Sequence, residues 1–196
     1  MDVEVHELMG TIARYLIPID SKLSALEYGK KAKAALLQMG IIFKAEDAPE
    51  GIFYNGEKST APFQIQPGDT EPGDDEYGFE MAGIFSSPHF ILVPDEYVDG
   101  VSCPKCNADM AEQWFSKVRD DEGKRIEHDS RDVRIVCPNC GAVLRLDQVK
   151  GETVDKFYMT DRYVCFWDAR PFKPEWVAEF DRQMGCHHET FDYWGP

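Results

Sequence analysis

The sequence predicts an α+β fold, and three features of the chain lead to that prediction. Residues 1–40 show two helical stripes of apolar residues, and residues 41–94 break into short apolar runs between turn-forming residues. Two Cys-x-x-Cys pairs then stand in mid-chain, with a strand, a helix and a strand expected after them. We therefore expect residues 1–100 and 150–196 to form one domain with an antiparallel sheet, and residues 101–149 to form an insert.

A pair of helices is expected at the start of the chain. The first stripe has the i, i+3, i+4, i+7 spacing of one helix face, ends before Pro18, and comprises Val5, Leu8, Met9, Ile12, Ala13 and Leu16. For the second helix, Asp20 or Ser21 can cap the N-terminus, and Gly40 suits the left-handed position after the C-terminus. Its stripe comprises Ala25, Tyr28, Ala32, Ala35, Leu36 and Met39.

Strands and turns are expected in the following segment. Its apolar runs are bounded by Gly, Pro, Asn and Asp, and they cover residues 41–43, 52–54, 79–85 and 90–93. Between them, residues 66–78 read QPGDTEPGDDEYG, which is too acidic and too rich in turn-forming residues to pack. We expect a mobile loop there.

The C-terminal part of the chain predicts a strand, a helix and a strand. Residues 157–169 are rich in aromatic and β-branched residues, as long strands are. Residues 173–185 predict a short helix with Pro174 in its first turn, and residues 186–194 predict the final strand.

The charge of the chain restricts its partners. The 196 residues carry a formal net charge of −15, and residues 45–100 hold thirteen acidic side chains against Lys58 alone, a net charge of −12. Nucleic-acid backbones are bound by Lys and Arg, so nucleic acid is not expected as the main partner. Neither a basic and apolar signal segment nor a run long enough for a membrane helix is present, so we expect a cytoplasmic protein without a membrane partner.

The two cysteine pairs predict a metal site. Cys103 with Cys106, and Cys137 with Cys140, are separated by 30 residues, and each Cys-x-x-Cys turn can supply two sulfurs to adjacent corners of a tetrahedron. Two redox-active dithiols are the alternative. Four thiolates suit zinc, and a closed shell of four sulfurs leaves no open position for a reacting water, which favours a structural role.

The residues around each pair favour similar turns. Pro104 and Pro138 preset φ at the second position, and Asn107 and Gly141, which follow the pairs, readily accept a positive φ. Strands are expected on both sides of the second pair, at residues 133–136 and 142–146.

With these two Cys-Pro-x-Cys knuckles, residues 101–149 resemble the zinc-ribbon group, in which knuckles at the tips of β-hairpins grip one structural zinc. The resemblance implies one Zn²⁺ held by Cys103, Cys106, Cys137 and Cys140. It departs from a compact ribbon at residues 111–132, which are longer and more charged than a minimal hairpin needs and are expected to form an extended hairpin tip.

Two further motifs bear on function. Residues 51–59, GIFYNGEKS, nearly match a phosphate-binding loop, but Glu57 stands where Lys must follow the second glycine, so we expect a turn and no nucleotide. Cys165, Cys186, His187 and His188 are candidate ligands of a second metal, although His187 faces away from its neighbours if the segment is a strand. The alternative is a half-buried cysteine with histidines at a strand edge.

Three functions follow from these patterns. The leading hypothesis is a zinc-stabilised, non-enzymatic protein whose acidic segment binds a basic protein, as an inhibitor or immunity-type protein would. The second is a nucleic-acid-associated zinc-ribbon factor, and the third is an enzyme that uses Cys186, His187 and His188 with nearby carboxylates. The second hypothesis depends on a cluster of basic residues at Lys117, Arg119, Lys124, Arg125, Arg131, Arg134 and Arg145.

Overall fold

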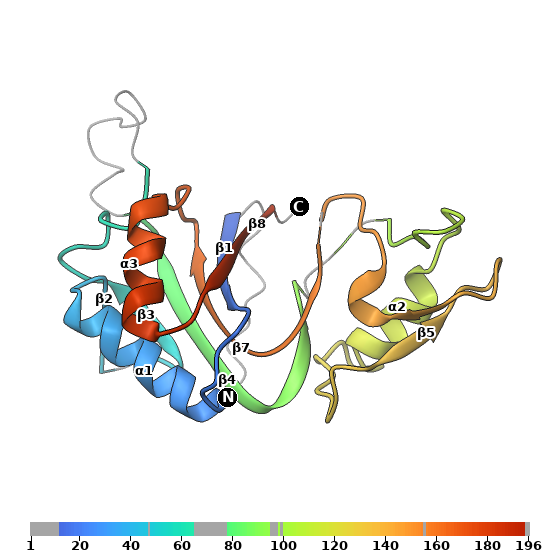
Figure 1. Cartoon of the computed structure of the whole chain (residues 1–196), viewed down its shortest axis with the longest axis horizontal. Helices are drawn as coiled ribbons and strands as arrows, with labels where there is room; N and C mark the ends of the chain where they lie inside the picture. Colours follow the sequence, from blue (N-terminus) through green and yellow to red (C-terminus); the bar gives the residue numbers. More distant parts are fainter. Residues whose placement is uncertain are drawn as a thin grey trace. The chain divides into compact units, whose positions relative to one another are not determined.

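The structure is a computed structural model that describes residues 12–46, 48–64, 78–94, 98, 100–154 and 156–194 (Figure 1). Its elements are β1 (Ile12–Pro18), α1 (Ala25–Gln38), β2 (Ile42–Phe43), β3 (Ile52–Asn55), β4 (Met81–Val93), α2 (Ala111–Val118), β5 (Arg134–Val136), β6 (Val143–Arg145), a 3-10 turn (Leu146–Gln148), β7 (Tyr158–Trp167), α3 (Pro174–Met184) and β8 (His188–Trp194). One sheet has the order β2-β3-β4-β7-β1-β8, and β5 pairs with β6 in a second sheet. Helices combined with antiparallel strand pairs confirm the α+β class.

The chain folds into two compact units. The first comprises Met1–Ser86 and Arg162–Pro196, and the second comprises Ser87–Asp161. The chain enters the second unit within β4 and leaves it within β7. Residues 101–149, which carry both cysteine pairs, lie within the second unit.

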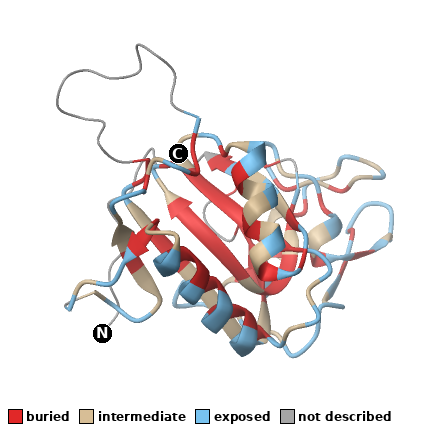
Figure 2. Ribbon diagram, turned by 60° about the vertical axis from the view of Figure 1, so that its left-hand side comes forward, coloured by how far each residue is buried: buried red, intermediate tan, exposed pale blue. Residues whose placement is uncertain are grey.

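The helices α1 and α3 of the first unit share one hydrophobic core with its sheet. Figure 2 shows buried residues on one side of each helix and exposed residues on the other side. Residues three or four apart on a helix, and two apart on a strand, point the same way. The core accordingly contains Tyr28, Ala32 and Leu36 of α1, Trp176, Phe180 and Met184 of α3, and Leu16, Phe53, Ala82, Val164 and Phe166 of the strands.

Aromatic rings from four neighbouring strands form a row on the other face of this sheet. Phe191 of β8 stacks on Tyr15 of β1 with ring centroids 4.6 Å apart, and Tyr15 lies 5.6 Å from Tyr163 of β7. The ring of Phe85 in β4 continues the row, 5.1 Å from Tyr163. Tyr15 and Tyr163 are both buried, so the middle of the sheet is apolar on both faces.

The first helix predicted from the sequence is wrong over residues 12–16, which belong to β1. β1 lies between β7 and β8, and six of its seven residues are buried. A strand that is covered on both faces is apolar almost throughout, so Ile12, Ala13 and Leu16 matched a helical stripe by coincidence. Val5, Leu8 and Met9 lie outside the described residues.

The second predicted helix is confirmed as α1, but its cap lies three or four residues later than predicted. Ser24, and not Asp20 or Ser21, is the N-cap: its hydroxyl accepts the backbone N–H of Glu27, whose carboxylate accepts the backbone N–H of Ser24. This reciprocal pair satisfies two backbone donors that would otherwise lack partners. Gly40 has the predicted left-handed conformation, with φ of 72°.

Most of the remaining elements follow the prediction. β7 and β8 lie within the predicted strand segments, and β3 extends one residue beyond its segment. α3 begins at Pro174 and ends at Met184, directly before Gly185, whose φ is 67°. The two runs predicted at residues 79–85 and 90–93 form one strand, β4, which continues through the exposed Pro88. The predicted loop at residues 66–78 lies outside the described residues, except for Gly78.

The second unit contains a helix that was not predicted. α2 lies within the segment expected to be an extended hairpin tip, and its residues Trp114 and Val118 are buried four positions apart. Asp109 accepts the backbone N–H of Ala111 at the start of this helix, and the Trp114 ring lies 5.3 Å from that of Phe157. In the described part of the chain no helix is both long and apolar enough to cross a membrane.

Candidate metal centre

Each cysteine pair lies in a tight turn of the second unit. Cys103 and Cys106 precede α2, and Cys137 and Cys140 lie between β5 and β6, where the predicted lead-in and return strands are confirmed. Because an antiparallel hairpin brings its two ends together, the second pair stands at the tip of the β5–β6 ribbon.

The two turns have the same backbone hydrogen bonds. The N–H of Asn107 donates to the Cys103 carbonyl at 2.9 Å, and the N–H of Gly141 donates to the Cys137 carbonyl at 3.0 Å. Asn107 and Gly141 have φ of 56° and 68°, which confirms the left-handed conformation expected at both positions. In each turn the N–H of the first cysteine also donates to a carbonyl five residues later, that of Ala108 or Ala142. The two knuckles are thus local copies of one structure.

The four sulfur atoms converge. The Sγ atoms of Cys103, Cys106, Cys137 and Cys140 all lie within 4.8 Å of one another. Two separations between the knuckles are 3.8 Å, from Cys103 to Cys140, and 3.6 Å, from Cys106 to Cys137. Cys103 and Cys137 are buried and Cys140 is exposed. These residues can together hold one metal ion.

The protonation of these thiols is uneven. The backbone of Ala108 and the side chain of Asn139 bond to the Cys106 sulfur and lower the pKa of its thiol to about 6. At Cys140 the backbone of Ala142 acts in the same direction, but the neighbouring sulfurs and burial outweigh it and raise the pKa to about 11. Once one thiol is ionised, a second negative charge beside it is unfavourable unless a cation neutralises it. The four sulfur atoms therefore lie in positions that suit thiolates around a bound cation better than four free thiols.

The basic residues near the knuckles are largely paired with carboxylates. Arg134 makes two bonds to Asp132, at 2.9 and 2.8 Å, and Arg145 makes two to Asp147, at 3.0 and 3.3 Å. Arg131 lies 3.8 Å from Asp161, and Lys124 lies 2.7 Å from Glu122. The cluster proposed for nucleic acid thus has much of its charge neutralised.

The second group of candidate ligands forms a hydrogen-bonded network in the first unit. His188 is buried at the start of β8, where its Nδ1 lies 2.6 Å from Oδ1 of Asp181 and its Nε2 lies 3.0 Å from the Tyr28 hydroxyl. The Sγ of Cys186 lies 3.9 Å from the same Nε2, and Nδ1 of the exposed His187 bonds to Oδ2 of Asp181 at 2.7 Å.

Burial favours the neutral forms of His188, Cys186 and Tyr28 in this network. It lowers the pKa of His188, although Asp181 acts in the opposite direction, and it raises the pKa of the Cys186 thiol. The pKa of Tyr28 is raised mainly by burial as well. Among the described residues only the four knuckle cysteines bring three or more ligand atoms together, and neither Cys165 nor Cys186 belongs to that group.

Sequence reasoning did not identify Tyr28 and Asp181 as members of this network. Tyr28 was placed in the apolar stripe of α1, and Asp181 is one of many carboxylates in an acidic chain. The segment at residues 51–59 contains β3 and a turn, as expected, and its Lys58 N–H donates to the carbonyl of Gly40 at 2.9 Å. Compared with known proteins, the chain matches no family model, no curated protein and no solved structure.

Proposed function

We propose that Cys103, Cys106, Cys137 and Cys140 hold one structural zinc ion, as the knuckles of a zinc ribbon do. Four sulfurs bonded to Zn²⁺ at about 2.3 Å define a tetrahedron whose edges are about 3.8 Å. The two inter-knuckle separations of 3.8 and 3.6 Å support this size. Thiolates are soft ligands that suit zinc, and four of them complete its shell. The ion then joins the turn before α2 to the tip of the β5–β6 ribbon.

We further propose that the zinc-stabilised protein is a non-enzymatic binding protein whose partner is basic. The observation that supports this is the charge distribution: residues 45–100 carry a net charge of −12 out of −15 for the whole chain. A segment of one sign attracts a cationic surface, speeds its association and repels nucleic acid. Binding of this kind weakens as salt rises, because the interaction is screened within about 8 Å at physiological ionic strength.

The alternative hypotheses have less support. Pairing of Arg134 with Asp132 and of Arg145 with Asp147 leaves little net positive charge for a nucleic-acid backbone. For an enzyme based on Cys186, the nucleophile would have to be a thiolate, whereas burial raises the pKa of this thiol and lowers that of the neighbouring His188.

The metal part of the proposal is tested on the purified full-length chain by elemental analysis. We expect one zinc ion per chain, retained through dialysis and released by a thiol-modifying mercurial. The variant Cys137→Ser is expected to lose the ion, and Cys165→Ala, which changes a buried cysteine of the first unit, is expected to keep it. A metal-free native protein, or full zinc content in Cys137→Ser, would contradict the assignment.

The partner class is tested with a cationic probe, and cytochrome c is suitable. The wild type is expected to bind the probe with an affinity that falls at least tenfold between about 50 and 200 mM salt. Replacement of Asp74, Asp75 and Glu76 by their amides should weaken binding more than the matched change at Glu112, Asp121 and Glu122. Equal effects of the two triple variants, or affinity independent of salt, would exclude the acidic segment as the binding site.

A further inference from the structure

Residues 21–45 form a positively charged region in an acidic chain. Five lysines stand there against one acidic residue, Glu27, which gives a net charge of +4 where the whole chain has −15. All five are exposed, and they are Lys22, Lys30, Lys31, Lys33 and Lys44. The carboxylate of Glu27 is held by Ser24 in the cap of α1. In the described part of the chain none of the five forms an ion pair with a carboxylate, and Lys31 and Lys44 donate to backbone carbonyls.

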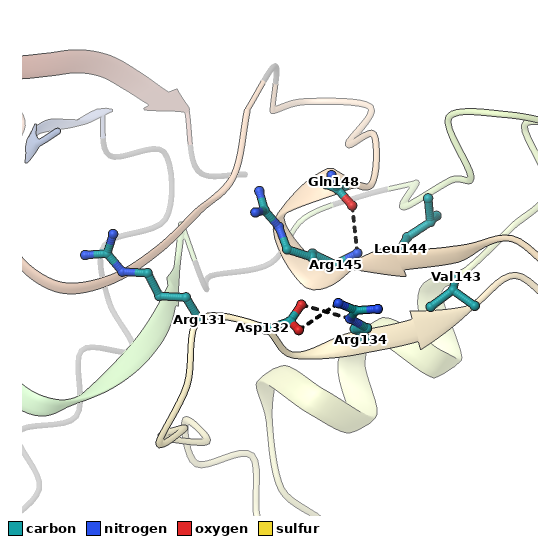
Figure 3. A pocket seen from close by; sticks show the side chains of 7 residues that line it. All are labelled: Arg131, Asp132, Arg134, Val143, Leu144, Arg145 and Gln148. Carbon is teal, nitrogen blue, oxygen red and sulfur yellow. Dashed lines mark hydrogen bonds and ion pairs between the residues drawn. The ribbon is translucent and has the colours of Figure 1, made fainter.

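The arginines of the second unit differ from these lysines. A hollow of about 430 Å³ beside the β5–β6 ribbon is lined in part by Arg131, Arg134 and Arg145 (Figure 3). Each of these guanidinium groups lies 3.8 Å or less from a carboxylate. The hollow therefore offers no net positive charge to an anion, whereas the charge of residues 21–45 is not neutralised by ion pairs with the described residues.

The outer side of α1 combines two of the lysines with exposed leucines. Figure 2 shows a row of exposed residues along this side of the helix. Leu26, Lys30, Lys33 and Leu37 follow one another at i, i+4, i+7 and i+11, the spacing of one stripe, which we call the α1 stripe. It is about 16 Å long. Leu26 and Leu37 are 61 and 39 % exposed, which is high for large apolar side chains.

A hollow of about 400 Å³ borders the α1 stripe. It is lined by Lys31, Ala34, Ala35 and Gln38 of α1 and by Arg182 and Gln183 of α3. Ala34 precedes Leu37 by three residues, which places the two side chains next to each other on the helix surface. A further helix laid beside α1 can therefore insert side chains between α1 and α3.

Two lysines converge on one aromatic ring beside the α1 stripe. The Nζ of Lys33 lies 5.6 Å from the ring centroid of Phe53, and the Nζ of Lys44 lies 5.8 Å from the same centroid. The ring attracts both ammonium groups, but the two like charges repel each other. A carboxylate of a bound partner placed near both ammonium groups would offset this repulsion.

We propose that the α1 stripe is a docking surface for an acidic amphipathic helix of a partner protein. The ammonium groups of Lys30 and Lys33 favour carboxylates, and Leu26 and Leu37 at the two ends favour apolar side chains. An anionic membrane or a nucleic acid is much larger than one stripe and is repelled by the ten acidic side chains in residues 45–86 of the same unit. A helix of a few turns contacts the stripe alone. This surface is separate from the acidic segment proposed above to bind a basic partner, and either can fail without the other.

The test uses the full-length protein and a fluorescein-labelled helical peptide of about 15 residues, long enough to span the α1 stripe. The peptide carries Glu and Leu on one face; one comparison peptide replaces Glu by Gln, and another replaces Leu by Ser. We expect saturable binding of the first peptide and at least about fivefold weaker binding of the other two. Lys30→Gln with Lys33→Gln should weaken binding about tenfold, whereas Lys30→Arg with Lys33→Arg should keep it within about threefold, because the charge is retained.

The matched control is Lys117→Gln with Lys150→Gln, which removes two exposed charges from the second unit and should leave the affinity within about twofold. Leu26→Ser should also weaken binding, which separates apolar docking from attraction of charge alone. Circular dichroism establishes that each variant is folded, as expected for substitutions at exposed positions.

The proposal is overturned if the Glu-Leu peptide fails to bind at about 1 mM, or if the variant with glutamine at positions 30 and 33 binds it as the control does. It is also overturned if vesicles of an anionic phospholipid, or a single-stranded oligouridylate, bind more tightly through the same lysines. Sedimentation showing a dimer that Lys30→Gln dissociates would assign the stripe to a second copy of the chain instead. Failure of cytochrome c to bind would contradict only the basic partner proposed above.

Discussion

His188 accepts the hydroxyl hydrogen of Tyr28 at Nε2, 3.0 Å away, while its Nδ1–H donates to Asp181 at 2.6 Å. This assignment of the imidazole hydrogen follows from the two partners: the Asp181 oxygen accepts the N–H of Nδ1, which leaves Nε2 as the acceptor for the Tyr28 hydroxyl. The two bonds join α1, the end of α3 and the start of β8, and they lie among the buried side chains of the first unit.

Removal of the Tyr28 hydroxyl should destabilise the protein. In Tyr28→Phe the buried Nε2 of His188 loses the hydroxyl donor and keeps only the Cys186 Sγ, a weak donor at 3.9 Å. A poorly satisfied buried acceptor costs about 1–3 kcal/mol. Urea unfolding measures the loss in the free energy of unfolding. Tyr54→Phe changes a partly exposed tyrosine of β3 and should cost less than about 0.5 kcal/mol. Equal stability of the two variants would mean that the Tyr28 hydroxyl contributes nothing.

The same network predicts a dependence of stability on pH. Burial lowers the pKa of His188 in the native state below its ordinary value of 6.5, despite the opposing effect of Asp181. The unfolded chain therefore binds a proton first, so the contribution of neutral His188 is complete above about pH 6.5 and is lost as pH falls through the lowered native pKa.

The measurement compares urea unfolding of the wild type and His188→Gln at about pH 7.5 and pH 5.5. The difference in free energy of unfolding between the two proteins should shrink at the lower pH. Since proton binding by the cysteines affects both proteins alike, it cancels in this difference. A constant or growing difference would contradict a lowered pKa.

Loss of the metal should loosen the second unit first. Cys137→Ser removes one ligand of the proposed ion, and segments joined through a metal lose order when it leaves. Hydrogen exchange followed by mass spectrometry should show lost protection in α2, β5 and β6, with protection of α1 and α3 retained. Protection lost equally in α1 and α3 would show that the two units unfold together.

Gly141 and Asn107 give a test of the knuckle geometry. A Cβ at Gly141 would meet nothing within 4 Å, so its substitution costs only the strain of φ at 68°. Gly141→Val should destabilise the protein by about 1–2 kcal/mol, because β-branched residues disfavour this conformation. Gly141→Asn should cost less than about 0.7 kcal/mol, since Asn107 holds the equivalent position in the first knuckle. Thermal unfolding in the presence of zinc ranks the variants; a larger loss in Gly141→Asn than in Gly141→Val would contradict this reasoning.

The cap of α1 gives a further prediction. Ser24→Ala removes the hydroxyl that accepts the Glu27 N–H and should lower the free energy of unfolding by about 1 kcal/mol. Ser116→Ala, which changes an exposed serine of α2, should cost less than about 0.5 kcal/mol, and urea unfolding compares them. Equal losses would mean that the capping box contributes no measurable stability.

The parts of the fold that depend on local chemistry were predictable from the sequence. The left-handed residues Gly40, Asn107 and Gly141 and the four cysteines follow from residue type and spacing, and the structure places them accordingly. The α2 helix also had a local signal, because Asp109, two residues before its first residue, accepts the N–H of Ala111, and Trp114 and Val118 are spaced by one turn.

The parts that depend on distant residues were not predictable. β1 is a strand because β7 and β8 pair with its two edges, and the partner residues lie about 150 to 180 positions further along the chain. The bond between Tyr28 and His188 likewise spans 160 residues, and nothing local at either residue indicates it. A spacing that fits a helix cannot exclude a strand whose partners are so remote.

The course of the chain between the two units has a practical consequence. β4 and β7 are hydrogen-bonded neighbours in the six-stranded sheet, and the second unit leaves the first from one of them and returns through the other. Neighbouring strands lie about 4.8 Å apart, a gap that a two-residue turn can bridge. A short Asn-Gly turn in place of residues 87–161 would close β4 and β7 into an ordinary hairpin. The cysteine-bearing unit can therefore be removed as one piece, and the removed segment can be grafted onto a hairpin of another scaffold.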